Sequence, residues 1–204
     1  IGCDTGLMAN FRAPGSRPTI DGGSMGNDTF ILADMNSLSG LNIIGGRHGI
    51  FGQSGGTHSI LGTRVSGASL EGVLINGSYM GDLIDNRFEE NGGDGFFVAG
   101  NFTGNIEQST FNKNGTNGGE NGLLILGDLT GDISNSQFND NDGSGLRVGG
   151  NLMGHITGSQ FNDNEAIGVV ANTLTGSVVG NSINGNEGEG MKLLSDSIRR
   201  SESI

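Results

Sequence analysis

Three observations predict an all-β protein built as a stack of short β-coils. A motif returns five times in the second half of the chain: an apolar residue, then Phe or Ile five places on, Asn three further, and Gly usually four further. Each of these glycines opens a short stretch in which apolar residues alternate with variable ones. The 41 glycines alone would indicate low complexity, but the apolar residues keep a fixed register, so the chain can bury a continuous narrow core.

The repeat length points to a solenoid. The five frames are Leu83-Phe88-Asn91-Gly95, Ile106-Phe111-Asn114-Gly122, Ile133-Phe138-Asn141-Gly145, Ile156-Phe161-Asn164-Gly168 and Val178-Ile183-Asn186-Gly190. Their Phe or Ile positions lie 23, 27, 23 and 22 residues apart. This spacing suits one solenoid coil and is too short for most two-helix repeats.

The segments after the glycines read as strands. They are Gly95–Val98, Gly122–Ile125, Gly145–Val148, Gly168–Ala171 and Gly190–Leu193, with apolar residues at the first and third positions after each glycine. A period of two places one face in the core and the other on the surface. One coil cannot pair its own backbone edges, so its stability must come from coils stacked roughly 4.8 Å above and below.

Two polar columns are expected where the stacked coils turn. The first is an asparagine ladder just before the glycine strand, formed by Asn91, Asn114, Asn141, Asn164 and Asn186. Asn tolerates the left-handed backbone of a tight corner, and its amide can bond the amides above and below. The second column contains Asn86, Ser109, Ser136, Ser159 and Asn181.

The same template extends backwards with lower fidelity. One earlier coil contains Ile60, Val65, Ala68, Gly72, Val73, Ile75 and Tyr79; a shortened one contains Leu38, Ile43, Gly49 and Ile50; a first one contains Ile20, Phe30, Leu32 and Met35. We therefore expect one solenoid domain over residues 15–198, with an N-terminal extension or cap at 1–14 and a tail at 199–204. The extra residues 115–120 are expected to form a surface loop.

Composition narrows the partners and cofactors. The formal charge of −12 argues against nucleic acid or an anionic membrane as partner. No apolar run approaches the roughly 20 residues of a membrane span, so direct membrane insertion is not expected. Cys3 is the only cysteine, and His48, His58 and His155 are scattered without metal-ligand spacing, so we expect no metal site. Gly26–Phe30 resembles one calcium-binding nonapeptide, a motif that works by recurring, so calcium remains a weak alternative.

The asparagine-ladder coils resemble right-handed parallel β-helices of the pectin-lyase-like superfamily, over nearly the whole chain. The resemblance implies a right-handed parallel β-helix, and the repeat template described above gives it about eight coils of 19–27 residues. The segments Phe88–Asn91, Phe111–Asn114, Phe138–Asn141 and Phe161–Asn164 are also similar to the Phe-x-x-Asn repeats of polymorphic outer-membrane autotransporter passengers. The Gly-Gly-Ala-Ile partner motif of those passengers is absent.

The superfamily includes polysaccharide lyases and epimerases, so an enzyme is one of two open hypotheses. Its candidate residues would be Arg147 and Lys192, in the outward column Phe97, Leu124, Arg147, Val170 and Lys192, together with Asp94, Asp142 and Glu165; Glu189 also lies near the preceding corner. A hydrolase needs two suitably spaced carboxylates, and a lyase needs a base beside calcium-binding acids. The sequence shows neither set of residues. Asp94, Arg147 and Glu165 are expected to be a solvated face.

The favoured hypothesis is a non-catalytic extracellular or cell-surface rod: an adhesin or passenger segment, a spacer or a filament subunit. The expected partner is a further copy of the chain, associating end to end or laterally, or a surface polysaccharide or protein ligand. Phe97, Leu124 and Val170 could form an exposed lateral strip.

Overall fold

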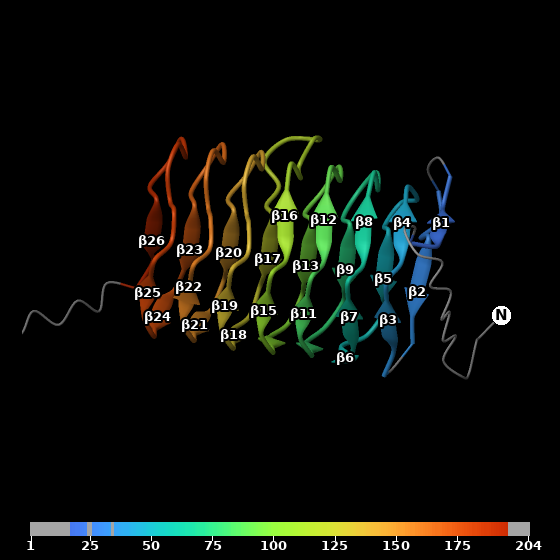
Figure 1. Cartoon of the computed structure of the whole chain (residues 1–204), viewed down its shortest axis with the longest axis horizontal. Coiled ribbons are helices and arrows are strands. Elements are labelled where there is room, and N and C mark those ends of the chain that lie inside the picture. The colour runs from blue at the N-terminus through green and yellow to red at the C-terminus, as the bar shows by residue number, and fades with distance from the viewer. Residues whose placement is uncertain (1–16, 24–25, 34, 196–204) are drawn as a thin grey trace, which may run out of the picture.

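The computed structural model describes residues 17–23, 26–33 and 35–195. It is a parallel β-helix whose short strands stack coil on coil into a rod (Figure 1), and no helix occurs in the described residues. One sheet has eight strands. The chain therefore passes that face eight times, in agreement with the expected number of coils. The predicted cap at 1–14 and tail at 199–204, like Cys3, fall outside the described residues.

Four parallel sheets run along the rod, and they are named here by their strand numbers. The eight-stranded sheet contains β2 (Phe30–Leu32), β5 (Ile50–Gly52), β9 (Val73–Ile75), β13 (Phe96–Val98), β17 (Leu123–Ile125), β20 (Leu146–Val148), β23 (Val169–Ala171) and β26 (Met191–Leu193). The six-stranded sheet contains β6 (Gly56–Thr57), β10 (Tyr79–Met80), β14 (Phe102–Thr103), β18 (Leu129–Thr130), β21 (Asn151–Met153) and β24 (Thr173–Thr175).

The other two sheets complete each coil. The seven-stranded sheet contains β3 (Ser37–Ser39), β7 (Ser59–Leu61), β11 (Leu83–Ile84), β15 (Ile106–Glu107), β19 (Ile133–Ser134), β22 (Ile156–Thr157) and β25 (Val178–Val179). The five-stranded sheet contains β1 (Thr19–Asp21), β4 (Asn42–Ile44), β8 (Arg64–Ser66), β12 (Arg87–Glu89) and β16 (Thr110–Asn112). Single bridges at Gln137, Gln160 and Ser182 continue this last face. One coil thus runs, for example, through β13, β14, β15 and β16.

Inward side chains from all four faces fill the core. The column that begins with Ile20, Ile43 and Val65 becomes a stack of phenylalanines. The ring centroids are 5.2 Å apart between Phe88 and Phe111, 4.7 Å between Phe111 and Phe138, and 4.8 Å between Phe138 and Phe161. These spacings match the distance between neighbouring strands, so each ring lies over the next. Burying one such ring stabilises the fold by roughly 1.5–3 kcal/mol.

The asparagine column forms a continuous buried chain of hydrogen bonds. Each Nδ2 group donates to the Oδ1 atom of the next Asn: Asn91 to Asn114 at 3.0 Å, Asn114 to Asn141 at 3.2 Å, Asn141 to Asn164 at 2.9 Å and Asn164 to Asn186 at 2.8 Å. Most of these amides also donate to the backbone carbonyl of a neighbouring coil, as Asn141 does to Phe111 at 2.9 Å. The ladder therefore satisfies polar groups that the narrow core excludes from water.

One expectation about this corner was wrong. The left-handed residue is the one before each ladder asparagine: Glu90, Lys113, Asp140, Asp163 and Gly185 have φ between 55 and 67°. The left-handed residue makes the bend and points outward, which leaves the following Asn free to point inward and bond. The second polar column has the same arrangement, because Asp85, with φ 54°, precedes Asn86.

The glycine that opens each strand is required by close packing. A Cβ atom on Gly95 would lie 2.6 Å from the carbonyl oxygen of Gly122 and 2.7 Å from Nδ2 of Asn114. Any larger residue would collide with the ladder and with the next coil. The recurring Asn and Gly of the motif therefore depend on each other.

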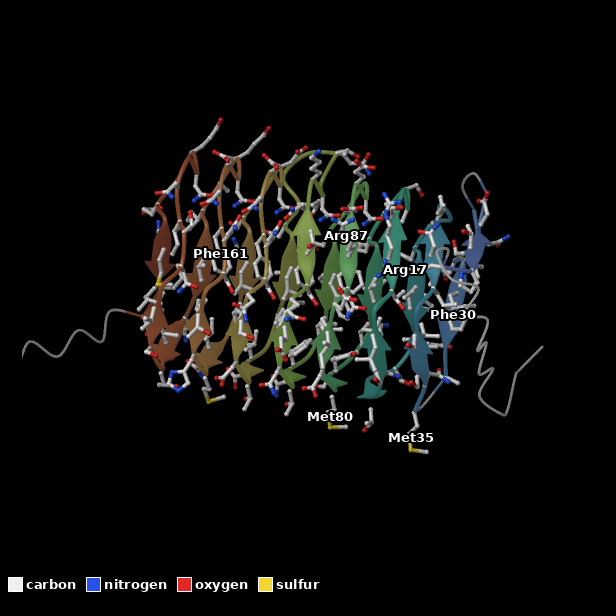
Figure 2. The ribbon with its side chains drawn as sticks, viewed as in Figure 1. Arg17, Phe30, Met35, Met80, Arg87 and Phe161 are labelled. Carbon is white, nitrogen blue, oxygen red and sulfur yellow. The ribbon has the colours of Figure 1, made fainter. Side chains whose placement is uncertain are left out.

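Two local features differ from the regular coils. The 115–120 insertion leaves the corner as an exposed arch (Figure 1), where Asn117 Nδ2 donates to the carbonyl of Ser69, two coils away, at 2.9 Å. Met35 was expected among the apolar residues of a first coil, and this was wrong: it is 81% exposed. Figure 2 shows Met35 and Met80 pointing away from the rod along one edge, because the chain turns between faces there.

Candidate functional site

The outward side chains of the eight-stranded sheet form one column along the rod. In-register pairing aligns Ile31, Phe51, Leu74, Phe97, Leu124, Arg147, Val170 and Lys192. The first five are apolar, and they range from half-buried to exposed. Val170 was expected to be exposed, but it is buried. It stands between Arg147 and Lys192, whose aliphatic stems are long enough to cover it.

The residues of the enzyme hypothesis are spread over different positions of this region. The strand that carries Val170 separates Arg147 from Lys192, a distance of roughly 10 Å at one strand spacing per coil. Lys192 Nζ instead lies 3.0 Å from Glu189 in an exposed ion pair. Asp142 and Glu165 occupy the corner before the sheet, where their backbone N–H groups donate to Asn114 and Asn141.

Asp94 does not belong to a solvated face, contrary to expectation. It is 2% exposed, and its Oδ1 atom accepts hydrogen bonds from the backbone N–H of Asn121 at 2.6 Å and from Asn121 Nδ2 at 3.0 Å. Burial raises the pKa of Asp94 to about 7, although the Asn121 hydrogen bonds oppose this shift. A carboxyl group this deeply buried cannot contact a polymer that lies along the outer face.

Sequence reasoning missed a cluster at the same corner in the N-terminal coils. His48 is 3% exposed, and both of its ring nitrogens contact carboxylates: Nδ1 lies 2.7 Å from Asp28 Oδ1, and Nε2 lies 3.0 Å from Glu71 Oε2. The ring also stacks on Phe51 with centroids 5.6 Å apart. Arg47 adds a second cation, with Nε 3.4 Å from Asp28.

The electrostatics of this cluster favour a charged imidazole. Burial alone would lower the pKa of His48, but the hydrogen bonds to Glu71 and Asp28 outweigh burial and raise it above 6.5. The hydrogen bond from His48 in turn lowers the pKa of Glu71, despite partial burial. The cluster is a three-residue ionic clamp across three successive coils. The sequence did contain a sign of this cluster, because Asp28, His48 and Glu71 each lie two residues before a strand of the eight-stranded sheet.

A shallow depression of about 490 Å³ lies at a different corner, where the six-stranded sheet passes into the seven-stranded one. Its lining comes from three coils: Met35, Asn36, Ser37, Thr57, His58, Ser59, Leu61, Gly81, Asp82 and Ile84. The lining is mainly apolar, and it contains none of the sequence-predicted catalytic residues. No chemistry is evident there beyond a small apolar contact surface.

The acidic and histidine side chains of the described residues do not gather into a metal centre. Among residues 17–23, 26–33 and 35–195, no group of three or more His, Cys, Asp or Glu side chains could hold a metal ion. Both ring nitrogens of His48 are engaged by carboxylates, and Nδ1 of His155 lies 2.8 Å from Ser177 Oγ. His58 is buried beside Tyr79, with ring centroids 5.9 Å apart. The three histidines therefore occupy separate environments.

Comparison with known proteins places the chain in a family. No curated protein and no solved structure matches it. A family model described as "Periplasmic copper-binding protein (NosD)" matches residues 19–198. Because this match spans almost the whole parallel β-helix, the chain belongs to the NosD family.

Proposed function

We propose that this chain is a non-catalytic β-solenoid rod of the cell envelope, acting as a spacer, an adhesin or passenger segment, or a filament subunit. The family description names periplasmic proteins, which is consistent with a cell-envelope or surface location; an extracellular position is part of the proposal. The observation that carries the proposal is the regular outer surface. Four columns of in-register strands run along the rod. The insertion at residues 115–120 lengthens one of the corners between them.

The arrangement of the candidate catalytic residues supports a rod over an enzyme. Asp94 is buried, while Arg147 and Lys192 are separated by a full strand. A polysaccharide lyase or epimerase would need a base and acids around one bond. These residues instead stand in separate positions along the sheet and its corner.

The test is incubation of the purified chain with pectate and alginate, with and without calcium. We expect no release of unsaturated or shortened products, and no difference between the wild type and Arg147→Ala. The Arg147→Ala variant should also keep its melting temperature, because Arg147 is exposed. Calcium-dependent cleavage that Arg147→Ala abolishes would overturn the proposal.

The family description also names copper, and within the described ranges no group of three or more His, Cys, Asp or Glu side chains could hold that ion. We expect calorimetric titration of the chain with Cu(II), and with Cu(I) under reducing conditions, to show no stoichiometric binding to residues 17–195. A Cys3→Ser variant controls for the cysteine outside the described part. Binding that survives Cys3→Ser and disappears in His48→Gln would contradict this expectation.

The proposed partner is a second copy of the chain, stacked end to end. Leu193 in the last described coil is 47% exposed, and Val178, Ile183 and Met191 are only partly buried, whereas their counterparts in the middle coils are fully buried. Such a surface matches another coil with the same four parallel faces. Association should therefore continue the sheets.

Leucines of similar exposure provide a matched test of this partner. Light scattering should show a mass that rises with concentration, and Leu193→Lys in the last described coil should suppress the rise. The control Leu126→Lys changes a leucine that is 52% exposed on the side of the rod, and it should leave the rise unchanged. A monomer at every concentration, or equal loss in both variants, would remove end-to-end association from the proposal.

A further inference from the structure

Four titratable residues stack in one column through the N-terminal coils. Register across β2, β5, β9 and β13 places Asp28, His48, Glu71 and Asp94 at the same position, two residues before each strand. The column then continues with Asn121, Ser144 and Ile167, which do not titrate, and ends with the exposed Glu189 before the last described strand. Among the described coils, titratable residues occupy this position in four successive coils in the N-terminal half, whereas Glu189 stands alone in the C-terminal half.

The column replaces the asparagine ladder in those coils. The ladder ends where Ala68 takes the next position, and the N–H of Ala68 donates to Asn91 Oδ1 at 3.1 Å. Beyond that point the ionic contacts Asp28–His48 at 2.7 Å and His48–Glu71 at 3.0 Å link the coils instead. The two halves of the rod are therefore held by different kinds of side-chain contact.

We propose that Asp28, His48, Glu71 and Asp94 form a proton-operated lock, which holds the first four coils together in acidic solution and loosens them progressively as the pH rises through neutrality. In the locked state His48 carries a proton on each ring nitrogen and donates one to each neighbouring carboxylate. Asp94 carries a proton as well. The column then holds two negative charges and one positive charge.

Two protons leave when the lock opens. Loss of the imidazolium proton removes one donor, so His48 can no longer bond both Asp28 and Glu71 as a donor. Loss of the Asp94 proton places a carboxylate one coil from Glu71, a spacing of roughly 4.8 Å. The column changes from a net charge of −1 to −3, and like charges in adjacent coils repel.

The surrounding charges do not cancel this change. Arg47 lies beside Asp28 and also lowers the pKa of Glu71, so it stabilises the first acid of the column. The charge of Glu120 acts on Asp94 from the neighbouring coil and disfavours its ionisation. The positive charge therefore lies at one end of the column, and repulsion increases at the other end.

The direction of the pH effect follows from proton linkage. Asp94 has a pKa of about 7 in the folded chain against 3.8 for the ordinary carboxyl, so its contribution is complete below pH 3.8 and is lost as the pH rises to 7. The pKa of His48 is raised above 6.5, so its contribution is lost from pH 6.5 upward. The lowered pKa of Glu71 acts oppositely, since its contribution is lost only as the pH falls below 4.5.

Hydrogen exchange can test the lock coil by coil. Peptides covering residues 28–75 and 138–171 should be followed at pH 5.5 and pH 8, after correction for the intrinsic exchange rate at each pH. We expect the opening constant of 28–75 to rise by about 10-fold or more, since each proton released contributes up to about 10-fold per pH unit. The opening constant of 138–171 should change by less than about 2-fold.

Two variants separate the two protons. Asp94→Asn should reduce the pH dependence between pH 5.5 and 7, and His48→Gln should reduce it above pH 6.5. The double variant should show nearly the same opening constant at both pH values. If either variant fails to fold, NMR titration of the His48 ring in the wild type still decides the matter. A His48 midpoint at or below 6.5, or equal protection of residues 28–75 at both pH values, would overturn the proposal.

Discussion

The two halves of the rod use the same fold with different internal contacts. From Phe88 to Asn164, phenylalanine rings and asparagine amides repeat in every coil, and each residue lies over its own kind. Before that point, the same columns contain Ile43, Val65 and Ala68, and ionic contacts cross the coils. The difference teaches that a solenoid needs satisfied polar groups and a filled core in every coil, but not a fixed chemistry. A neutral ladder is insensitive to pH, whereas an ionic column is not.

The largest expected effect comes from the aromatic stack. Phe138→Ala should cost about 3–5 kcal/mol, because it opens a cavity between two stacked rings in a core that cannot collapse. The control Phe97→Ala, on the half-buried outer column, should cost about 1 kcal/mol. Urea unfolding measures both. Equal costs would mean that the stacked ring contributes no more than a ring on the surface.

Breaking the ladder should have the next largest effect. Asn141 accepts from the N–H of Asn114 at 3.0 Å and donates to Asn164 at 2.9 Å, so Asn141→Ala leaves buried groups of both neighbours without partners. We expect a loss of about 2–3 kcal/mol in the free energy of unfolding.

A neighbouring asparagine provides the control for the ladder. Asn139 lies two residues away in an outward row, and its Oδ1 atom accepts the N–H of Asn162 at 2.8 Å in a more accessible position. Asn139→Ala should cost about 1 kcal/mol or less. A ladder variant as stable as this control would show that water replaces the buried amide.

The smallest expected effect separates the buried ion pair from an exposed one. Glu71→Gln removes one carboxylate from His48, so we expect a loss of about 1 kcal/mol at pH 6, discounted because Glu71 is partly exposed. Glu189→Gln removes an exposed pair with Lys192 and should leave the melting temperature unchanged. Thermal unfolding at pH 6 compares the two variants. If Glu71→Gln also left the melting temperature unchanged, the ionic contacts of the N-terminal half would not contribute to stability.

Much of the fold could be predicted because the stacked residues repeat in kind. The spacing of Phe and Asn fixed the coil length, and the glycine strands emerged with their expected alternation: Phe96 and Val98 are buried and Phe97 is half-buried. The narrower resemblances, to the pectin-lyase-like superfamily and to autotransporter passengers, stay predictions. The predicted domain limits also stay predictions at both ends.

The candidate site was harder to predict, because its residues share a position and not an identity. Asp28, His48, Glu71 and Asp94 are three residue types spread over coils of unequal length, so no repeated letter marks their column. Asp94 looked like a surface acid because acids usually are solvated. Its burial depends on the coil above, where Asn121 bonds to it.

The sequence by itself determined the coil period, the inward and outward alternation, and the column of asparagines, because each depends on contacts between like residues at a fixed spacing. Only the tertiary structure decided which unlike residues meet across the coils, which residue at each corner takes the left-handed conformation, and which acids lose contact with water. These properties depend on register between coils of different length, and that register exists only once the coils are stacked.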